Sequence, residues 1–384
     1  MSGADSFVDR AGPCRAGEEL DAAQVDAYLK PRIPGLEGAP EIGQFARGAS
    51  NLTYLLRYPG RELVLRRPPF GHKAKGAHDM LREARVMAAL KPHYPVVPAV
   101  LATCDDPAVL GCDFYVMERI AGIIPRQDLP AGLGFGEAET RRLCVNVVDK
   151  LVELHSIALT SDPSPESEDR SARNSPSPLG ESRGEGLLSL GKGEGYVQRQ
   201  VEGWSRRFRD ARTEDVADFE AVMAWLAARR PAREVAIRVI HGDFRFDNVV
   251  LDPADPFTVI GVLDWEMATL GDPLMDLGNA LAYWVQADDD EYFRRTRRQP
   301  TDAPGMLTRA EVVAHYAART GLAVGNFDFY EVFGLFRVAV IVQQIWRRYR
   351  EGHTKDAQFA AFGPLVNYLD GRCRRLVAAS QPGA

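Results

Sequence analysis

The chain has 384 residues, of which 45% are apolar and 26% charged, and its formal net charge is −6 at pH 7. This acidic balance argues against nucleic acid as the main partner, because a phosphate backbone attracts a basic surface. No apolar run approaches the roughly 18 residues that a membrane helix needs, so no membrane partner is expected. The five cysteines form no C-x-x-C pair, which predicts reduced thiols and a cytoplasmic protein.

The first 120 residues have the pattern of a strand-rich unit with one inserted helix. Helices are expected at 18–31 and at 77–90, the second of which is followed by Pro92. Apolar or alternating runs flanked by turn residues predict strands at 42–47, 53–58, 62–67, 99–103 and 113–119. We therefore expect residues 1–120 to form a small antiparallel β-rich lobe.

The rest of the chain, 121–384, is predicted to be a larger helical lobe. A long helix should begin near Gly136, because apolar residues recur at helical spacing at Leu143, Val147, Leu151 and Leu154. The segment 161–195 is crowded with Ser, Pro, Gly, Glu and Arg, which predicts a disordered insertion. Further helices are expected at 196–209 and 215–229, strands within 236–264, and a core helix at 329–345. The whole pattern indicates an α+β fold with two lobes.

The most informative stretch is His241-Gly242-Asp243-Phe244-Arg245-Phe246-Asp247-Asn248, which precedes two apolar runs and then Asp264. The runs, 249–251 and 259–263, are joined by a turn sequence and predict a β-hairpin. Phosphoryl transfer from ATP needs hard oxygen ligands for Mg²⁺ and a carboxylate that faces the attacking hydroxyl. Asp and Asn at strand ends can also be simple turn formers. The conjunction of H-G-D-x-x-x-x-N, hairpin and L-D-W-E is more specific than any of its parts.

With these motifs the sequence resembles the aminoglycoside-phosphotransferase and choline-kinase superfamily, which has the protein-kinase-like fold. The resemblance covers nearly the whole chain outside 161–195. It implies that Asp243 is the catalytic aspartate, that Asn248 and Asp264 bind Mg²⁺, and that His241 holds the shape of the loop. It also implies ATP as the phosphate donor and a small-molecule hydroxyl compound as the acceptor.

In proteins of this fold, the third strand of the small lobe carries a cation that binds the nucleotide phosphates. An acid on the following helix pairs with that cation. Side chains alternate along a strand, so Val64 and Arg66 share one face while Arg67 lies on the other. The resemblance therefore implies Arg66 as the phosphate-binding residue and Glu83 as its partner. Arg stands where Lys is usual, and it binds phosphate in a different geometry.

The other nucleotide contacts are implied to come from two segments of backbone. The loop between the first two strands lacks the G-x-G-x-x-G pattern but could cradle phosphates with Gly48, Ser50 and Asn51. The end of the last small-lobe strand would hold adenine through its backbone, at Met117, Glu118 and Arg119, before Ile120.

Several further stretches narrow the resemblance to the branch of phosphotransferases associated with acyl-CoA dehydrogenases. They lie at 65–69, 77–83, 115–119, 271–277 and 345–352. This branch implies a role in fatty-acid catabolism, a hydroxyacyl acceptor and a functional association with an acyl-CoA dehydrogenase.

Other functions stay open at this point. An aminoglycoside or amino-alcohol acceptor would need acids near the catalytic loop, which the run 288–291 could supply. A CoA-bearing acceptor would instead need arginines, for which the candidates are Arg294, Arg295, Arg297, Arg298, Arg347 and Arg348. A nucleotide-binding pseudokinase or scaffold is the third alternative, given Arg66 and the single-glycine loop.

Overall fold

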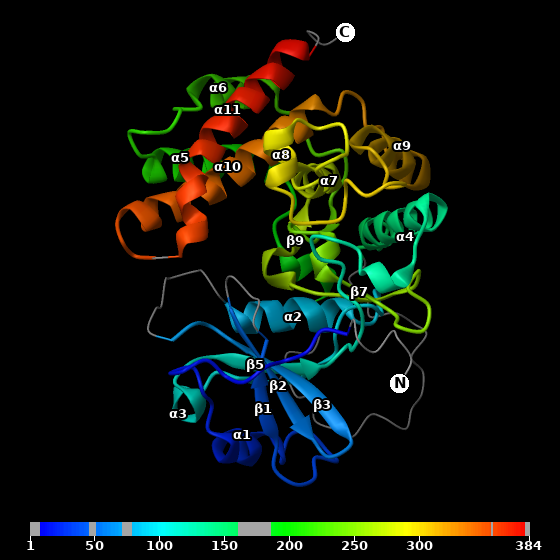
Figure 1. Ribbon diagram of the computed structural model, residues 1–384, viewed down its shortest axis with the longest axis vertical. Helices are drawn as coiled ribbons and strands as arrows, with labels where there is room; N and C mark the ends of the chain where they lie inside the picture. The colour runs from blue at the N-terminus through cyan, green and yellow to red at the C-terminus, as the bar shows by residue number, and fades with distance from the viewer. Residues whose placement is uncertain (1–7, 46–50, 71–78, 160–185, 355, 381–384) are drawn as a thin grey trace.

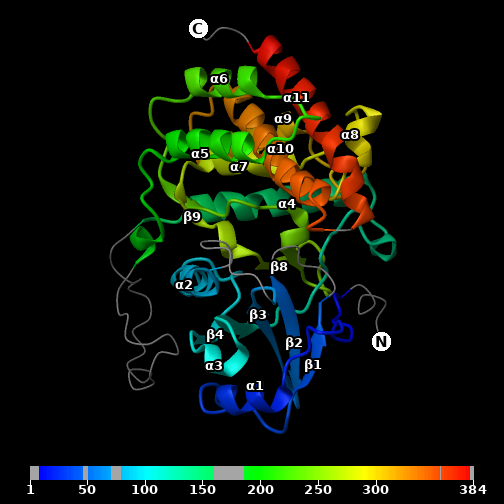
Figure 2. The same ribbon diagram turned by 90° about the vertical axis from the view of Figure 1, so that its left-hand side faces the viewer.

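The structure, a computed structural model, describes residues 8–45, 51–70, 79–159, 186–354 and 356–380. Two lobes follow one another along the chain, with the strand-rich N-terminal lobe at the bottom of Figure 1 and the helical C-terminal lobe above it. Figure 2 shows the same division from the side. The predicted α+β fold, with a small antiparallel sheet and a larger helical lobe, is confirmed.

The N-terminal lobe is built on a five-stranded antiparallel sheet with the strand order β1-β2-β3-β5-β4. Its strands are β1 (Glu41–Gln44), β2 (Leu52–Tyr58), β3 (Arg61–Arg67), β4 (Val100–Cys104) and β5 (Phe114–Glu118). β2 and β3 form a tight hairpin, in which Gly60 adopts a φ of +74° that suits glycine. Every strand predicted for this lobe is present, with ends shifted by a few residues.

The two faces of this sheet pack against different partners. Leu63 and Leu65 of β3 belong to a core shared with α1 (Ala22–Leu29), whereas Val64 lies in the core that continues through α2 (Met80–Leu90) into the other lobe. In both views α2 lies between the sheet and the C-terminal lobe (Figures 1 and 2). A side chain on the Val64 face of β3 is therefore directed toward the boundary between the lobes.

The C-terminal lobe is a group of helices around one buried core. The four residues of the predicted apolar stripe are all buried, and α10 contacts α5, α7 and α11. The α-helices of this lobe are α4 (Glu137–His155), α5 (Tyr196–Ala211), α6 (Glu220–Arg229), α7 (Pro273–Ala282), α8 (Glu291–Arg295), α9 (Arg309–Thr320), α10 (Asp328–Arg350) and α11 (Phe362–Ala379). A further short helix, α3 (Pro107–Leu110), precedes β5 in the N-terminal lobe.

Two short antiparallel ribbons lie where the lobes meet. β6 (Arg238–Ile240) pairs with β9 (Thr269–Gly271), and β7 (Val249–Leu251) pairs with β8 (Val259–Val262). The hairpin predicted at 249–263 is thus confirmed. Ile123 lies in the segment that joins the two lobes after β5. It forms an antiparallel β-bridge with Leu251, so this joining segment pairs with β7.

Two predicted boundaries are wrong. The helix expected at 215–229 begins only at Glu220, because Phe219 is buried with a left-handed φ of +54°. The predicted insertion 161–195 lies mostly outside the described residues, but its last part, 186–195, is described and packed. There Leu187 of the 3-10 turn η4 (Leu187–Leu190) is only 2% exposed, so the predicted disorder is wrong for residues 186–195.

Helix α10 is the single helix among the described segments that is long and apolar enough to cross a membrane by those two measures. Within its most apolar 18-residue window, however, 78% is buried inside the protein. The prediction of a buried core helix at 329–345 is confirmed.

Candidate active site

The loop that follows β6 carries two of the predicted site residues, Asp243 and Asn248. Asn248 Nδ2 donates to the carbonyl oxygen of Asp243 at 2.9 Å, and the Asp243 N–H donates to His241 Nδ1 at 3.2 Å. Because Asn248 donates through its nitrogen, its carboxamide oxygen can serve as a metal ligand. The His241 ring braces the loop, as the resemblance implied.

Asp264 follows β8 and has a left-handed backbone with a φ of +69°, which Asp tolerates better than most residues. The preceding Leu263 N–H donates to Asn248 O at 2.8 Å, and Leu263 O lies 2.9 Å from His241 Nε2. The two predicted Mg²⁺ ligands are therefore held on adjoining stretches of backbone. The structure brings Asp243, Asn248 and Asp264 together at the boundary of the lobes.

Arg66 reaches from the sheet to this group. Its Nη1 donates to Glu83 Oε1 at 2.6 Å and its Nη2 to Asp264 Oδ1 at 3.1 Å. The Glu83 side chain is 1% exposed, and burial raises its pKa although Arg66 opposes that shift. Arg67 packs on the other face of the sheet, with its guanidinium 3.7 Å from the centre of the Phe70 ring. The alternation predicted for this strand is confirmed.

The predicted phosphate loop is described only at its end, and Gly48 and Ser50 lie outside the described residues. Asn51, just before β2, is buried, and its Nδ2 donates to Glu266 Oε2 at 2.9 Å. Burial, and then the charge of Asp264, raises the pKa of Glu266 to about 7. Asn51 therefore joins the sheet to the turn η6 (Trp265–Met267) that follows Asp264.

In the predicted adenine segment, 117–120, the polar side chains have partners of their own. The Glu118 carboxylate accepts from Lys91 Nζ at 2.8 Å, and the Arg119 guanidinium pairs with Glu62. Beyond the end of β5, this segment forms no backbone–backbone hydrogen bond with the described residues. Its backbone, rather than these side chains, is therefore the part that can meet an adenine ring.

Asp276 of α7 lies in the stretch 271–277, where no role was predicted for it, and it holds the loop 241–248. Its two carboxylate oxygens accept from the N–H groups of His241 and Gly242 at 2.7 and 2.8 Å, and His155 Nε2 lies 3.1 Å from Oδ2. Burial opposes ionisation of this carboxyl, but the hydrogen bond from His155 and the backbone bonds hold the pKa of Asp276 below its ordinary value. The signal in the sequence was a lone acid within the apolar run 273–282.

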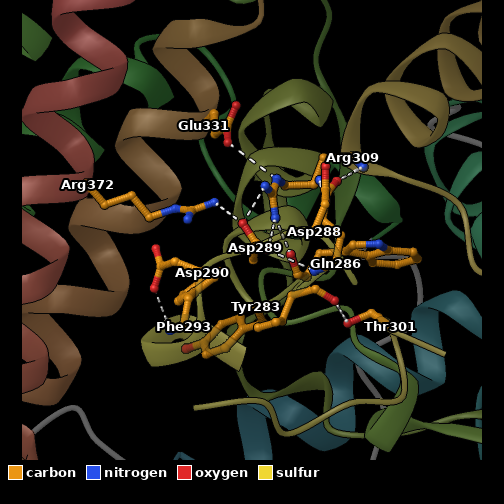
Figure 3. Close-up of polar contacts among 12 residues, drawn as sticks. Tyr283, Gln286, Asp288, Asp289, Asp290, Phe293, Thr301, Arg309, Glu331 and Arg372 are labelled. Carbon is orange, nitrogen blue, oxygen red and sulfur yellow. Dashed lines mark hydrogen bonds and ion pairs between the residues drawn. The ribbon is translucent and has the colours of Figure 1, made fainter. Parts of the chain in front are cut away.

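In the acidic run 288–291, Asp289 and Asp290 have partners within the helical lobe (Figure 3). Asp289 lies between two cations, with Arg309 at 2.7 and 2.9 Å and Arg372 at 2.8 Å. Asp290 caps α8 by accepting from the Phe293 N–H at 3.0 Å. These acids bind α9 and α11 to the loop before α8.

Three of the six arginines considered for a CoA-bearing acceptor have local partners. Arg295 pairs with Glu291, and Arg347 pairs with Glu351 at 2.7 Å. Arg297 lies 2.8 Å from Asp128. These pairs account for the three arginines as local structure and assign none of them to an acceptor.

The donor set at Asp264 fits Mg²⁺. Within the described segments, no group of three or more His, Cys, Asp or Glu side chains could hold a metal ion without other ligands. A carboxylate and a carboxamide oxygen are hard ligands, and Mg²⁺ is commonly bound by one or two such groups together with substrate phosphates. Asn248 and Asp264 therefore suit a metal whose remaining ligands come from a nucleotide and water.

The sequence is similar to known proteins along most of its length. Residues 41–312 match the model of the Phosphotransferase enzyme family. The chain is 32% identical over 365 residues to acyl-CoA dehydrogenase family member 10 of Mus musculus, an alignment that covers 94% of this chain and 32% of that protein. The chain thus spans about a third of the length of this relative.

Solved structures agree on a two-lobed kinase-like fold. A Ralstonia eutropha protein named after the aminoglycoside phosphotransferases superposes with a TM-score of 0.74 at 28% identity, over 94% of this chain and 100% of that one. A thermostable mutant of an aminoglycoside phosphotransferase, in a ternary complex with ADP and hygromycin B, shares the fold with a TM-score of 0.53 at 16% identity, over 94% and 100% of the two chains. Because the family model covers more than half of the sequence, the chain belongs to the phosphotransferase enzyme family.

Proposed function

We propose that the protein transfers the γ-phosphate of ATP to a hydroxyl group of a small organic acceptor. The observation that carries this proposal is the convergence of Asp243, Asn248 and Asp264 with the Arg66–Glu83 ion pair. Phosphoryl transfer depends mainly on positioning and on charge stabilisation, which such a set supplies.

Asp243 is the proposed acceptor of the hydroxyl proton. The acceptor oxygen forms a bond to the γ-phosphorus, the bond from that phosphorus to the bridging oxygen breaks, and the proton passes to Asp243. Arg245 Nη2 lies 3.3 Å from Asp243 Oδ2 and Arg245 Nε 3.1 Å from Asp247 Oδ1. Arg245 therefore restrains the side chains of both aspartates, and its charge opposes the rise that burial causes in the pKa of Asp247.

The nucleotide side of the proposal rests on Arg66, Asn248 and Asp264. Mg²⁺, when bound, would neutralise charge on the phosphates, and Asn248 and Asp264 would hold it through their oxygens. Arg66 is already oriented by Glu83, and its charge-assisted hydrogen bonds are among the strong ones for phosphate. The ADP complex of an aminoglycoside phosphotransferase with the same fold supports a nucleotide donor.

For the acceptor we propose a hydroxyacyl compound of fatty-acid catabolism, with a functional association with an acyl-CoA dehydrogenase. The name of the mouse relative supports this choice. The pairing of Asp289 with Arg309 and Arg372 removes one reason to expect a cationic aminoglycoside or amino alcohol.

The test is ADP release from Mg·ATP with hydroxyacyl-CoAs, free hydroxy acids, amino alcohols and aminoglycosides as acceptors. We expect release that depends on an acceptor and that falls by about 10²-fold or more in Asp243→Asn, since proton transfer contributes that much. Asp255→Asn, in the exposed turn of the β7–β8 hairpin, is the matched control and should retain activity. Nucleotide binding with no turnover of any acceptor, and no ATP hydrolysis, would instead favour a pseudokinase or scaffold.

A further inference from the structure

A cavity of about 340 Å³ opens beside the catalytic loop, and cations predominate among its charged lining residues. Gly242, the neighbour of Asp243, forms part of its wall. The cations come from distant parts of the chain: Arg82 of α2, Lys192, Arg199 of α5 and Arg337 of α10. Glu266 is the single acid among the described residues that line the cavity.

Arg337 is the buried cation of this cavity, and it has no carboxylate partner among the described residues. It is only 4% exposed, yet no carboxylate of the described residues lies within 4.0 Å of its guanidinium, and its Nη1 has no hydrogen-bond partner there. Its guanidinium carbon lies 5.4 Å from the centre of the Trp204 ring, and a cation–π contact is weaker than a paired charge. A buried charge is normally paired or hydrogen-bonded because its desolvation is costly. Arg337 therefore points to an anion that binds in the cavity.

A second buried polar side chain lines the same cavity. Asn279 of α7 is 4% exposed, and its Oδ1 has no hydrogen-bond partner among the described residues. A carboxamide oxygen accepts from O–H or N–H groups. The ligand that satisfies both side chains carries an oxyanion together with a hydrogen-bond donor, such as a hydroxyl.

The outer part of the cavity extends the positive charge toward solvent. Lys192 and Arg199 are exposed. The guanidinium of Arg82 is fixed in the cavity wall because it donates to the backbone oxygens of Glu266 at 3.0 Å and Ala268 at 2.5 Å. A cleft lined by one sign of charge attracts ligands of the opposite sign. The positive charge of these lining residues would repel a cationic acceptor.

We propose that this cavity is the acceptor subsite and that Arg337 binds an oxyanion of the hydroxylated acceptor. The inference rests on the proposed function, since it places the acceptor hydroxyl near Asp243. The oxyanion is a carboxylate if the acceptor is a free hydroxy acid, and a phosphate if the acceptor is a CoA thioester. Arg337 is a binding residue in this assignment, and Lys192 and Arg199 draw the anion toward it.

Thermal unfolding of wild-type protein, Arg337→Met and Arg348→Met provides the first test. Arg348 lies on the same helix but is exposed, so it is the matched control. Because Met replaces an unpaired buried charge with an apolar side chain, Arg337→Met should melt at a temperature equal to or above that of the wild type. Inorganic phosphate should raise the melting temperature of the wild type and of Arg348→Met but not that of Arg337→Met. All samples contain a saturating non-hydrolysable ATP analogue, which occupies the nucleotide site.

Equal phosphate shifts in the three proteins would overturn the inference. So would a clearly lower melting temperature of Arg337→Met without phosphate, because Arg337 would then belong to the fold rather than to a ligand site. Neither result depends on turnover, so this test remains decisive even if no acceptor is phosphorylated.

Kinetics with paired acceptors then identify the oxyanion. For an anionic acceptor, Arg337→Met should raise KM about tenfold or more, as expected when a charge-assisted bond is lost. The KM for ATP should stay unchanged, and Arg337→Lys should restore part of the acceptor affinity. A free hydroxy acid and its CoA thioester are compared, and the one whose KM responds to Arg337→Met supplies the anion. If only cationic acceptors were phosphorylated, and their KM were the same in the wild type and in Arg337→Met, the anion subsite would be wrong. The proposed kinase activity would still be supported.

Discussion

Arg66 Nη1 lies 2.6 Å from Glu83 Oε1, and this buried ion pair joins β3 to α2. The same guanidinium reaches across the lobe boundary, with Nη2 3.1 Å from Asp264 Oδ1. One side chain thus links the sheet, the helix that packs on it and the proposed metal ligand. Binding of phosphate at Arg66 would compete with its contact to Asp264, while Glu83 keeps the guanidinium in place.

We expect Arg66→Ala to lower the rate of ATP use by roughly tenfold to a thousandfold, because a charge that acts in the transition state is lost. Arg66→Lys should retain more activity, since it keeps a cation at this position. Arg67→Ala should leave ATP use unchanged and lower stability by about 1 kcal/mol, because Arg67 packs over Phe70 on the other face. Steady-state KM and kcat for ATP, with denaturant unfolding of each variant, check these expectations. If Arg66→Ala kept full activity and Arg67→Ala were inactive, the nucleotide would bind on the Arg67 face of β3 and the proposed nucleotide site would be wrong.

Substitution of Asp264 should remove activity without unfolding the protein. We choose Asp264→Asn because Asn tolerates the left-handed backbone that Asp264 adopts. Loss of a charged Mg²⁺ ligand should abolish Mg²⁺-dependent turnover, while the melting temperature without nucleotide should change little. The stabilisation that Mg²⁺ adds in the presence of ATP analogue should also disappear. Near-normal turnover in Asp264→Asn would show that the metal is held elsewhere.

Replacement of Asp276 should damage both stability and the catalytic loop. Asp276→Asn leaves two buried N–H groups and the His155 ring without their carboxylate, so we expect a loss of at least about 2 kcal/mol in the free energy of unfolding at pH 7. Activity should fall as well, because the backbone before Asp243 is no longer held.

The difference in the free energy of unfolding between the wild type and Asp276→Asn should become smaller in acidic solution. The native pKa of Asp276 is lowered, so its stabilisation is fully present above the unfolded pKa, near 4, and is lost as the pH falls through the native pKa. The difference should therefore be constant from about pH 8 to 5 and shrink only in more acidic solution. The titratable groups that face Asp276 are His155, His241, Tyr196, Tyr316 and Asp272, and His155→Gln in both backgrounds separates the part of the pH dependence that comes from the histidine in direct contact. Urea unfolding of both proteins between about pH 8 and pH 3 measures this difference. A difference that vanishes near pH 6 would contradict the role given to the ionised Asp276 carboxylate.

Two adjacent leucines test the packing of the turn η4 (Leu187–Leu190). Leu187 is 2% exposed and Leu188 is 51% exposed. Leu187→Ala should lower the free energy of unfolding by about 2–4 kcal/mol because it leaves a cavity, whereas Leu188→Ala should change it by no more than about 0.5 kcal/mol. Equal effects of the two substitutions on chemical unfolding would mean that this turn does not pack as described.

The sequence by itself determined the parts of the site that depend on local chain geometry. Side chains alternate along a strand whatever lies around it, so Arg66 and Arg67 could be assigned to opposite faces before any fold was known. Asp243, Asn248 and Asp264 lie on one loop and at the end of one hairpin. Their meeting therefore follows from a short stretch of backbone and its turn.

Which distant charges meet could not be predicted from the sequence, because it depends on how the helices pack. The run 288–291 looked like a free acidic cluster until Arg309 and Arg372, from two later helices, were found on Asp289. In the same way Arg82, Lys192, Arg199 and Arg337 share no motif, and they line one cavity because α2, α5 and α10 converge on the catalytic loop. Local periodicity states which face of an element is apolar, but the partner of a buried charge depends on packing between elements far apart in the chain.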